Sequence, residues 1–212
     1  MARRRLHALD DLLDAAERLV VSDNPAGFTL RGLATAAGVS NGTIYHAFHS
    51  RDELLARLWL RAAARLGAIM NDAVNAATND SGPDGAHQAV VDTALAPAIL
   101  TRRYPASAQL FFAQRRDQLF STDLTAETVA ELTQVQERFV ALLVLLARGV
   151  WDRADRIAVD AITACIVDIP GGMLRRRLLE DRPIDAAIER RMEAAVRAVL
   201  AVPLDPPAPR ID

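Results

Sequence analysis

The spacing of apolar residues predicts helices along the whole chain. Near the start, Leu6, Leu9, Leu13, Ala16 and Val20 recur every three or four residues, which places them on one face of a helix with aspartates opposite. The same periodicity predicts further helices near residues 30–37, 40–48, 52–75, 86–100, 105–119, 125–148, 153–179 and 184–202. We therefore expect an all-α fold of about nine helices, followed by a proline-rich, frayed tail at 203–212.

Capping and turn residues predict two short helices joined by a tight turn. Thr29 stands where its hydroxyl can accept a hydrogen bond from an amide at the start of one helix, and Ser40 does the same for the next. Gly38 occupies the position between them that favours positive φ. Ser50, with Glu53 three residues later, predicts a capping box at the start of the long helix that follows.

This arrangement is a helix-turn-helix, in which the first helix supports the second and the N-terminal residues of the second enter the DNA major groove. The second helix begins with the polar sequence SNGT, which a helix facing a core would not carry. Hydroxyl and amide groups there can donate to phosphate oxygens or reach base edges, and a glycine allows the backbone to approach closely. The predicted DNA-binding residues are Thr29, Arg31, Ser40, Asn41, Gly42, Thr43, Tyr45, His46 and Arg51.

Two aromatic residues of this segment have different expected roles. Phe48 is expected in the small core of the helix-turn-helix, together with Leu33, Ala34, Ala37, Val39 and Ile44. Tyr45 could also be a core aromatic, but its polar neighbours favour contact with phosphate.

Residues 28–55 resemble the N-terminal DNA-binding domain of the TetR family of bacterial regulators. The residues that carry the resemblance are Thr29, Leu33, Ala34, Ala37, Gly38, Val39, Ser40, Gly42, Thr43, Ile44, Tyr45, Phe48, Arg51, Asp52, Glu53, Leu54 and Leu55. The remainder of the chain matches that family only in the number and length of its helices. Arg51 stands where the family commonly has lysine, and its guanidinium keeps the charge and the phosphate contact.

The resemblance implies a homodimer in which the last two long helices, here 153–179 and 184–202, pair with those of a second copy as a four-helix bundle. It also implies that the central helices form a cavity for a small-molecule effector. The side chains that could contact an effector are Trp59, Tyr104, Phe111, Phe112, Arg115 and Phe139. Apolar residues at helical spacing more often belong to a core, so we expect only a subset of them to do so.

Composition restricts the kinds of site that the chain can carry. The formal net charge is −2, so a DNA-binding surface must be a local patch, and the 25 basic residues, all arginine, most simply reflect a coding bias. Cys165 is the only cysteine, which excludes an intrachain disulfide and a multi-cysteine metal site, and its apolar surroundings predict a buried, unreactive thiol. His46 and His49 are closely spaced but lack a further ligand, so we expect neither a metal nor a cofactor.

The most apolar segment, 157–174, contains Asp160, Asp168 and Pro170, and therefore predicts a core or interface helix rather than a membrane span. The first residues lack the apolar segment of a signal peptide, so we expect a cytoplasmic protein with no membrane contact. Two alternatives stay open for the basic cluster near the start, an arm over DNA or a solvated terminus, and its members are Arg3, Arg4 and Arg5.

These features together predict a helix-turn-helix DNA-binding domain at 1–50 and a helical ligand-binding and dimerisation domain at 51–202. The predicted function is a transcriptional repressor that a small, mostly apolar effector releases from a palindromic DNA operator. The alternative is a helical small-molecule carrier or enzyme whose N-terminal module binds another protein. No nucleophile–base pair, paired acids or phosphate loop supports that alternative.

Overall fold

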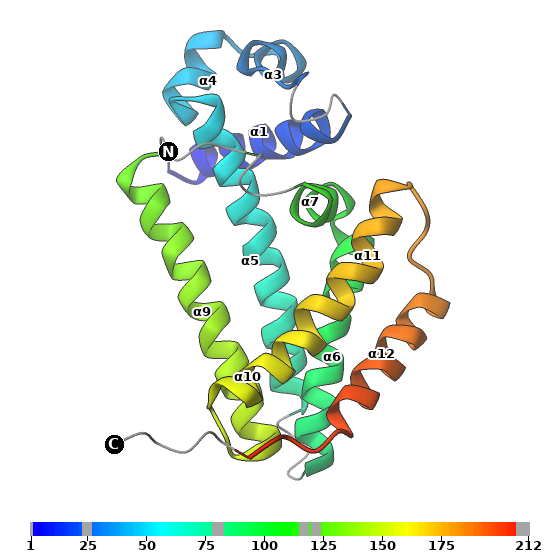
Figure 1. Ribbon diagram of the computed structural model, residues 1–212. Coiled ribbons are helices and arrows are strands. Elements are labelled where there is room, and N and C mark those ends of the chain that lie inside the picture. The colour runs from blue at the N-terminus through cyan, green and yellow to red at the C-terminus, as the bar shows by residue number, and fades with distance from the viewer. Residues whose placement is uncertain (1, 23–26, 78–82, 115–118, 120–123, 207–212) are drawn as a thin grey trace. The chain divides into compact units, whose positions relative to one another are not determined.

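The computed structural model describes residues 2–22, 27–77, 83–114, 119 and 124–206, and Figure 1 shows its helices in chain order. These are α1 (Ala2–Ser22), α3 (Leu30–Ala37), α4 (Asn41–Phe48), α5 (Arg51–Ala77), α6 (Pro83–Arg103), α7 (Pro105–Ala108), η1 (Gln109–Ala113), α9 (Ala126–Trp151), α10 (Arg156–Thr163), η2 (Ala164–Asp168), α11 (Ile169–Leu179) and α12 (Ala186–Leu200). The π-helical segment η1 continues α7, and η2 joins α10 to α11. Counted in this way the described residues form nine helices and no strand, which confirms the all-α fold.

The chain forms two compact units, of which the first contains residues 1–64 and 104–135. Its buried core joins α1, α3, α4 and the start of α5 to residues of the second segment. The core residues are Leu12, Ala16, Val20, Phe28, Leu30, Leu33, Ala34, Ile44, Phe48, Leu54, Leu55, Ala56, Leu58, Leu60, Leu110, Leu119 and Leu132. Residues 104–135 therefore share one core with the helix-turn-helix. The domain boundary predicted near residue 50 concerns function, whereas these two units are defined by packing. That domain boundary therefore stays a prediction.

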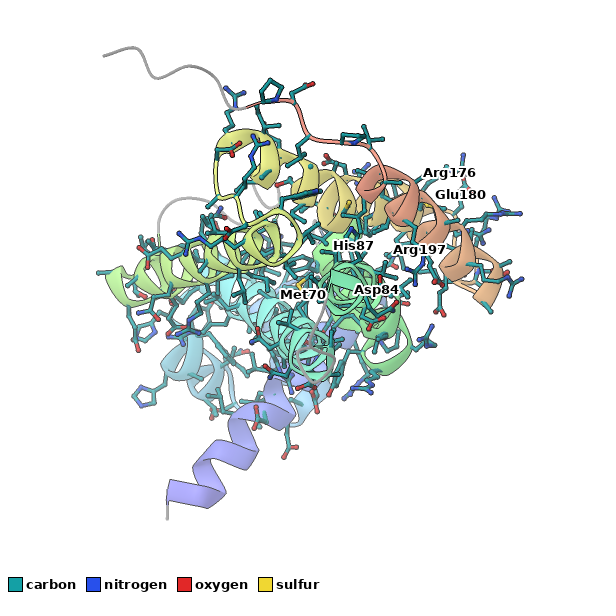
Figure 2. The ribbon with its side chains drawn as sticks, turned by 90° about the horizontal axis from the view of Figure 1, so that it is seen from below. Met70, Asp84, His87, Arg176, Glu180 and Arg197 are labelled. Atoms are coloured by element: carbon teal, nitrogen blue, oxygen red, sulfur yellow. The ribbon has the colours of Figure 1, made fainter. Side chains whose placement is uncertain are left out.

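The second unit contains residues 65–103 and 136–212 and has its own core. This core joins the end of α5, α6, most of α9, the run from α10 to α11, and α12. Its members include Val74, Val90, Val91, Ala94, Leu143, Leu146, Ala158, Ile162, Cys165, Ile166, Val196 and Leu200. Arg197 of α12 also donates to the Gln88 side chain of α6 at 2.7 Å, and Figure 2 shows Arg197 near Asp84 and His87 of that helix.

Two helices end or begin at places that differ from the sequence prediction. The helix expected over 105–119 stops at Ala113, because Gln114 adopts an extended backbone conformation. The helix expected from residue 153 begins at Arg156, because the Asp155 carboxylate accepts from the amides of Ile157 and Ala158 and caps the first turn. Arg153 lies before that helix, where its guanidinium holds the capping carboxylate at 2.6 and 3.0 Å.

The run from α10 through η2 to α11 contains a proline that explains its irregular middle. Pro170 has no N–H to donate to the carbonyl four residues earlier, and its ring crowds that carbonyl. A π-helical turn over Ala164–Asp168 absorbs this local mismatch, and the helix continues on the far side to Leu179. The expectation of one long helix ending near residue 179 is confirmed with this interruption.

Candidate nucleic-acid interface

Local hydrogen bonds fix the angle between α3 and α4. The Thr29 hydroxyl accepts from the Gly32 amide at 3.0 Å, and the Ser40 hydroxyl accepts from the Thr43 amide at 3.2 Å, so both predicted N-caps are confirmed. Gly38 ends α3 with φ 66° and ψ 29°, and the next amide, of Val39, donates to the Ala34 carbonyl at 3.0 Å. This is the Schellman arrangement, in which glycine takes the left-handed conformation without a steric cost.

Helix α4 buries one side and exposes the other. Ile44 and Phe48, one turn apart, are buried in the core of the unit, as predicted. The remaining positions of the helix face solvent, and Tyr45 is 55% exposed, which makes it a large side chain held on the outside rather than a core aromatic. Eight of the nine predicted DNA-binding residues share this exposed character: Thr29, Arg31, Ser40, Asn41, Gly42, Thr43, Tyr45 and His46.

Gly42 has no packing role inside the protein. A Cβ built on it would lie 3.7 Å from the Ser40 hydroxyl, which is an ordinary contact, so the fold itself would accept a larger residue. The glycine does permit an external group to approach the backbone of the first turn, where the Thr43 amide is bonded to Ser40 and the amides before it have no carbonyl of the helix to pair with. The first turn of α4 therefore offers donors that suit a phosphate oxygen.

Arg51, like the two N-cap residues, is a predicted DNA-binding residue that also has an internal role. Its Nε donates to the Phe28 carbonyl at 3.1 Å, and its Nη1 lies 3.2 Å from an Asp52 carboxylate oxygen. These contacts tie the start of α5 to the segment before α3. The side chain is 37% exposed, and its contact with a phosphate stays a prediction.

The capping box predicted at the start of α5 is only half correct. The Ser50 hydroxyl accepts from the Glu53 amide at 3.0 Å, as expected. The Glu53 carboxylate, however, does not return to the Ser50 amide, which donates instead to the Phe48 carbonyl at 2.5 Å. Glu53 is instead bonded to Thr125 and Thr128, more than seventy residues later in the chain.

The predicted effector contacts separate into different parts of the molecule. Trp59 stacks on Phe111 with ring centroids 5.1 Å apart, and Phe112 meets Phe111 edge-on at the same distance, so three of these residues gather in the first unit. Tyr104 is in the same unit, at the start of α7. Phe139 packs against the core of the second unit, and Arg115 lies outside the described residues. Their contact with an effector stays a prediction.

Cys165 is fully buried, and burial raises the pKa of its thiol to about 11. The prediction of a buried core cysteine is therefore confirmed, and the raised pKa favours the unreactive thiol over the reactive thiolate. Among the residues that the structure describes, no group of three or more histidine, cysteine or acidic side chains could hold a metal ion.

The sequence missed two sets of polar contacts that bind the helix-turn-helix segment to residues 104–135. Glu17 of α1 is buried and accepts from the Ser107 hydroxyl at 2.9 Å, and Glu53 is bonded to Thr125 and Thr128 as described above. The partners lie far apart in the chain, so no local pattern pairs them. A signal was present for Glu17, because it interrupts the apolar face of α1 between Leu13 and Val20.

Comparison with known proteins assigns the N-terminal residues to a family. Residues 12–58 match the family described as bacterial regulatory proteins, tetR family. Two uncharacterised HTH-type transcriptional regulators of Mycobacterium tuberculosis, from strains CDC 1551 and H37Rv, are 44% identical over 66 residues. That stretch is 31% of this chain and spans about a third of the length of each relative, 33%.

Solved structures extend the similarity to almost the whole fold. A tetR-family regulatory protein from Rhodococcus RHA1 has a TM-score of 0.67 at 19% identity, covering 91% of this chain and 96% of that one. The regulator FadR of Bacillus subtilis, solved with stearoyl-CoA, has a TM-score of 0.62 at 13% identity, covering 90% and 97%. These likenesses show the fold. Residues 12–58 therefore match the DNA-binding part of the tetR family of bacterial regulatory proteins, and the described residues around them share the all-helical fold of the solved structures.

Proposed function

We propose that this protein is a dimeric transcriptional repressor whose α4 helices bind a palindromic DNA operator and which a small, mostly apolar effector releases. The match of residues 12–58 to a family of bacterial regulatory proteins supports a regulator rather than an enzyme. It acts in the cytoplasm, where the DNA is accessible.

The observation that carries the proposal is the outer face of α4. Its first turn presents exposed hydroxyl and amide groups, Tyr45 stands outward one turn later, and Gly42 has no function in the packing of the protein itself. Small polar groups and amides at a helix N-terminus are the groups that position a protein on the DNA backbone and contact base edges. In a dimer, two such helices would enter successive major grooves about 34 Å apart.

The exposed apolar face of the second unit supports a dimer. Within the described chain, Arg156–Leu179 is one helical run that is long and apolar enough to cross a membrane, and 33% of its most apolar window is buried. Val167 on this run is exposed, and Gly171 and Gly172 have no atom within 4 Å of an added Cβ. A second copy of the chain would cover this face, with α12 beside it, and remove it from water.

A membrane is a less suitable partner for the same face. Arg156 and Asp160 are both well exposed on the run and form an ion pair, with 3.4 Å between Nε and Oδ2. Three further arginines, at positions 175–177, lie near its end. Charged side chains inside a bilayer are costly, whereas the rim of a protein interface accepts them.

The aromatic cluster of Trp59, Phe111 and Phe112 supports an effector with a large apolar part, because such a molecule gains most from contact with aromatic side chains. The B. subtilis FadR complex holds stearoyl-CoA in a similar fold, which is consistent with an effector of this character. The effector would release DNA by favouring a conformation in which the two α4 helices no longer match the operator.

Fluorescence anisotropy on DNA from upstream of the protein's own gene tests the proposal, with an unrelated duplex and a salt titration as controls. We expect tight, selective binding that weakens steeply with salt. Equal, weak binding to both duplexes, together with failure to enrich any fragment of the source genome, would contradict it. A protein that still bound an apolar ligand under those conditions would be a carrier instead.

A further inference from the structure

Glu53 is a buried carboxylate at the junction between the helix-turn-helix and the rest of the first unit. It is 4% exposed and lies in the first turn of α5. The Thr125 amide donates to its Oε2 at 3.1 Å, the Thr125 hydroxyl donates to its Oε1 at 3.0 Å, and the Thr128 hydroxyl also donates to Oε1. The first turn of α5 is therefore fastened to the first turn of α9.

The charged form of Glu53 is held by these bonds. Burial alone would raise the pKa of the Glu53 carboxyl, but the hydrogen bonds from Thr128 and Thr125, with the nearby charge of Arg57, lower it below its ordinary value. The Nε atom of Arg57 lies 3.9 Å from Oε1 of Glu53. The Nη1 atom of Arg57 also pairs with Oε1 of Glu131 on α9 at 3.2 Å.

Glu17 is a second buried carboxylate with the same kind of contact. It lies on α1, is 5% exposed, and accepts from the Ser107 hydroxyl of α7 at 2.9 Å. Arg61 of α5 lies 3.9 Å from Glu17 and 2.7 Å from Asp14, so α1, α5 and α7 meet at one polar cluster. Glu17 and Ser107 are both enclosed by the protein.

Each of these two sets of hydrogen bonds forms what we call a clasp, and the two follow the same pattern. One clasp joins Glu53 to Thr125 and Thr128, and the other joins Glu17 to Ser107. In each, the carboxylate comes from the N-terminal segment and the hydroxyl donors come from residues 104–135. A buried carboxylate that loses its donors is strongly unfavourable, because it has been removed from water and has no replacement. The hydrogen bonds of the two clasps can form only when α7 and the start of α9 occupy their present positions. A displacement of α7 would break the bond to Glu17, and a displacement of α9 would break the bonds to Glu53.

Helix α4 is directly connected to this arrangement. Two residues separate the end of α4 from the start of α5, and the intervening backbone is held by bonds from the His49 amide to the Tyr45 carbonyl at 2.9 Å and from the Ser50 amide to the Phe48 carbonyl. Figure 1 shows α4 leading directly into α5, so we expect a shift in the first turn of α5 to move α4 as well.

We infer that Glu53 and Glu17 are positioning residues, through which α7 and the start of α9 hold α4 in the arrangement that binds DNA. This inference rests on the proposed function and identifies its regulatory connection: an effector that displaces α7 or α9 breaks a clasp and releases α4. The residues contact no DNA themselves and act through the backbone of α1 and α5.

The test compares Thr128→Val, which removes the hydroxyl at nearly constant shape, with Thr128→Ser, which keeps it. On the duplex selected by the wild-type protein, we expect Thr128→Val and Ser107→Ala each to weaken binding about tenfold, as expected for loss of one charge-assisted hydrogen bond. Thr128→Ser should stay within about twofold of wild type. Hydrogen exchange of the amides at residues 41–48 should be faster in Thr128→Val without DNA present.

Two control variants separate positioning from general stability. Thr133→Val removes an exposed hydroxyl of the same helix that bonds only locally, to the Val129 carbonyl. Ile162→Val removes a buried methylene in the core of the second unit. Both should bind DNA as wild type does and leave exchange at residues 41–48 unchanged.

The outcomes distinguish this inference from the proposed function. Normal DNA binding and normal exchange in Thr128→Val would overturn the inference, as would equal losses in Thr128→Ser or in Ile162→Val. A wild-type protein that selects no DNA would instead overturn the proposed function. In that case the exchange measurement still decides whether the clasp positions α4.

Discussion

Helix α4 and the run from α10 to α11 both bury one side and expose the other, but their exposed sides have opposite chemistry. The outer side of α4 is polar and small, with Tyr45 as its one large residue. The outer side of the longer run carries Val167, Gly172 and Leu179, with the charged residues Asp160, Asp168 and Arg175 also exposed on the run. A polar surface suits a partner that is bound and released through water and ions, whereas an apolar surface suits a permanent partner. Under the proposed function, the reversible contact with DNA and the lasting contact with a second copy therefore lie on different helices.

The largest effect should come from placing a charge on the apolar side. Val167→Glu would bury two related carboxylates in the proposed dimer, and we expect the dimer dissociation constant to rise at least about a hundredfold. Analytical ultracentrifugation measures this. Val140→Glu, at another exposed valine of the second unit, is the matched control and should leave the dimer intact. Equal behaviour of the two variants would remove the basis for this dimer face.

A second prediction concerns the polar side. Tyr45→Ala removes an exposed ring and hydroxyl, so operator affinity should fall about tenfold to a hundredfold. The free energy of unfolding should change by less than about 0.5 kcal/mol, because the side chain is on the surface. Anisotropy and urea unfolding measure the two quantities. Tyr45→Phe separates the hydroxyl from the ring. A large loss of stability would mean that Tyr45 is a core residue after all.

Two glycines of the helix-turn-helix should respond in opposite directions. Gly38→Ala forces a side chain into the left-handed conformation and should destabilise the protein by about 1 kcal/mol. Gly42→Ala should stabilise the free protein by about 0.5 kcal/mol, since alanine favours helix and the space is available. Under conditions in which both variants are fully folded, only Gly42→Ala should weaken DNA binding. If both variants lost stability, Gly42 would have an internal role that the structure does not contain.

A similarly small effect is expected at the end of α4. His49 has φ 58° and ψ −52° and lies between the bonded Phe48 carbonyl and Ser50 amide, which is a strained three-residue turn. His49→Gly should therefore raise the free energy of unfolding by about 0.5 to 1 kcal/mol. Thermal unfolding of the variant checks this, with His46→Gly, inside the helix, expected to lose stability.

The sequence was sufficient where structure depends on neighbouring residues. Thr29, Gly38 and Ser40 act within one helical turn, so their roles follow from residue type and position alone. The start of α10 could also have been predicted from the sequence, because aspartate is a strong N-cap residue and Asp155 directly precedes the helix.

The clasps could not be found in this way. Glu53 satisfies a local capping pattern, and only the folded chain reveals that Thr125 and Thr128 compete successfully for its carboxylate. The separation of Trp59 and Phe111 from Phe139 likewise depends on how the long helices pack, which periodicity within each helix does not determine.

The buried thiol of Cys165 has a practical consequence. Burial raises the pKa of this thiol to about 11, so it stays protonated at neutral pH, and the sulfur is enclosed by the core of the second unit. We therefore expect a maleimide or a thiol-reactive spin label not to label Cys165 in the folded protein. A cysteine introduced at exposed Ala47 would be the single reactive site on the chain's described residues. The natural sequence is thus already suited to attaching a spectroscopic probe to α4 without prior removal of cysteine.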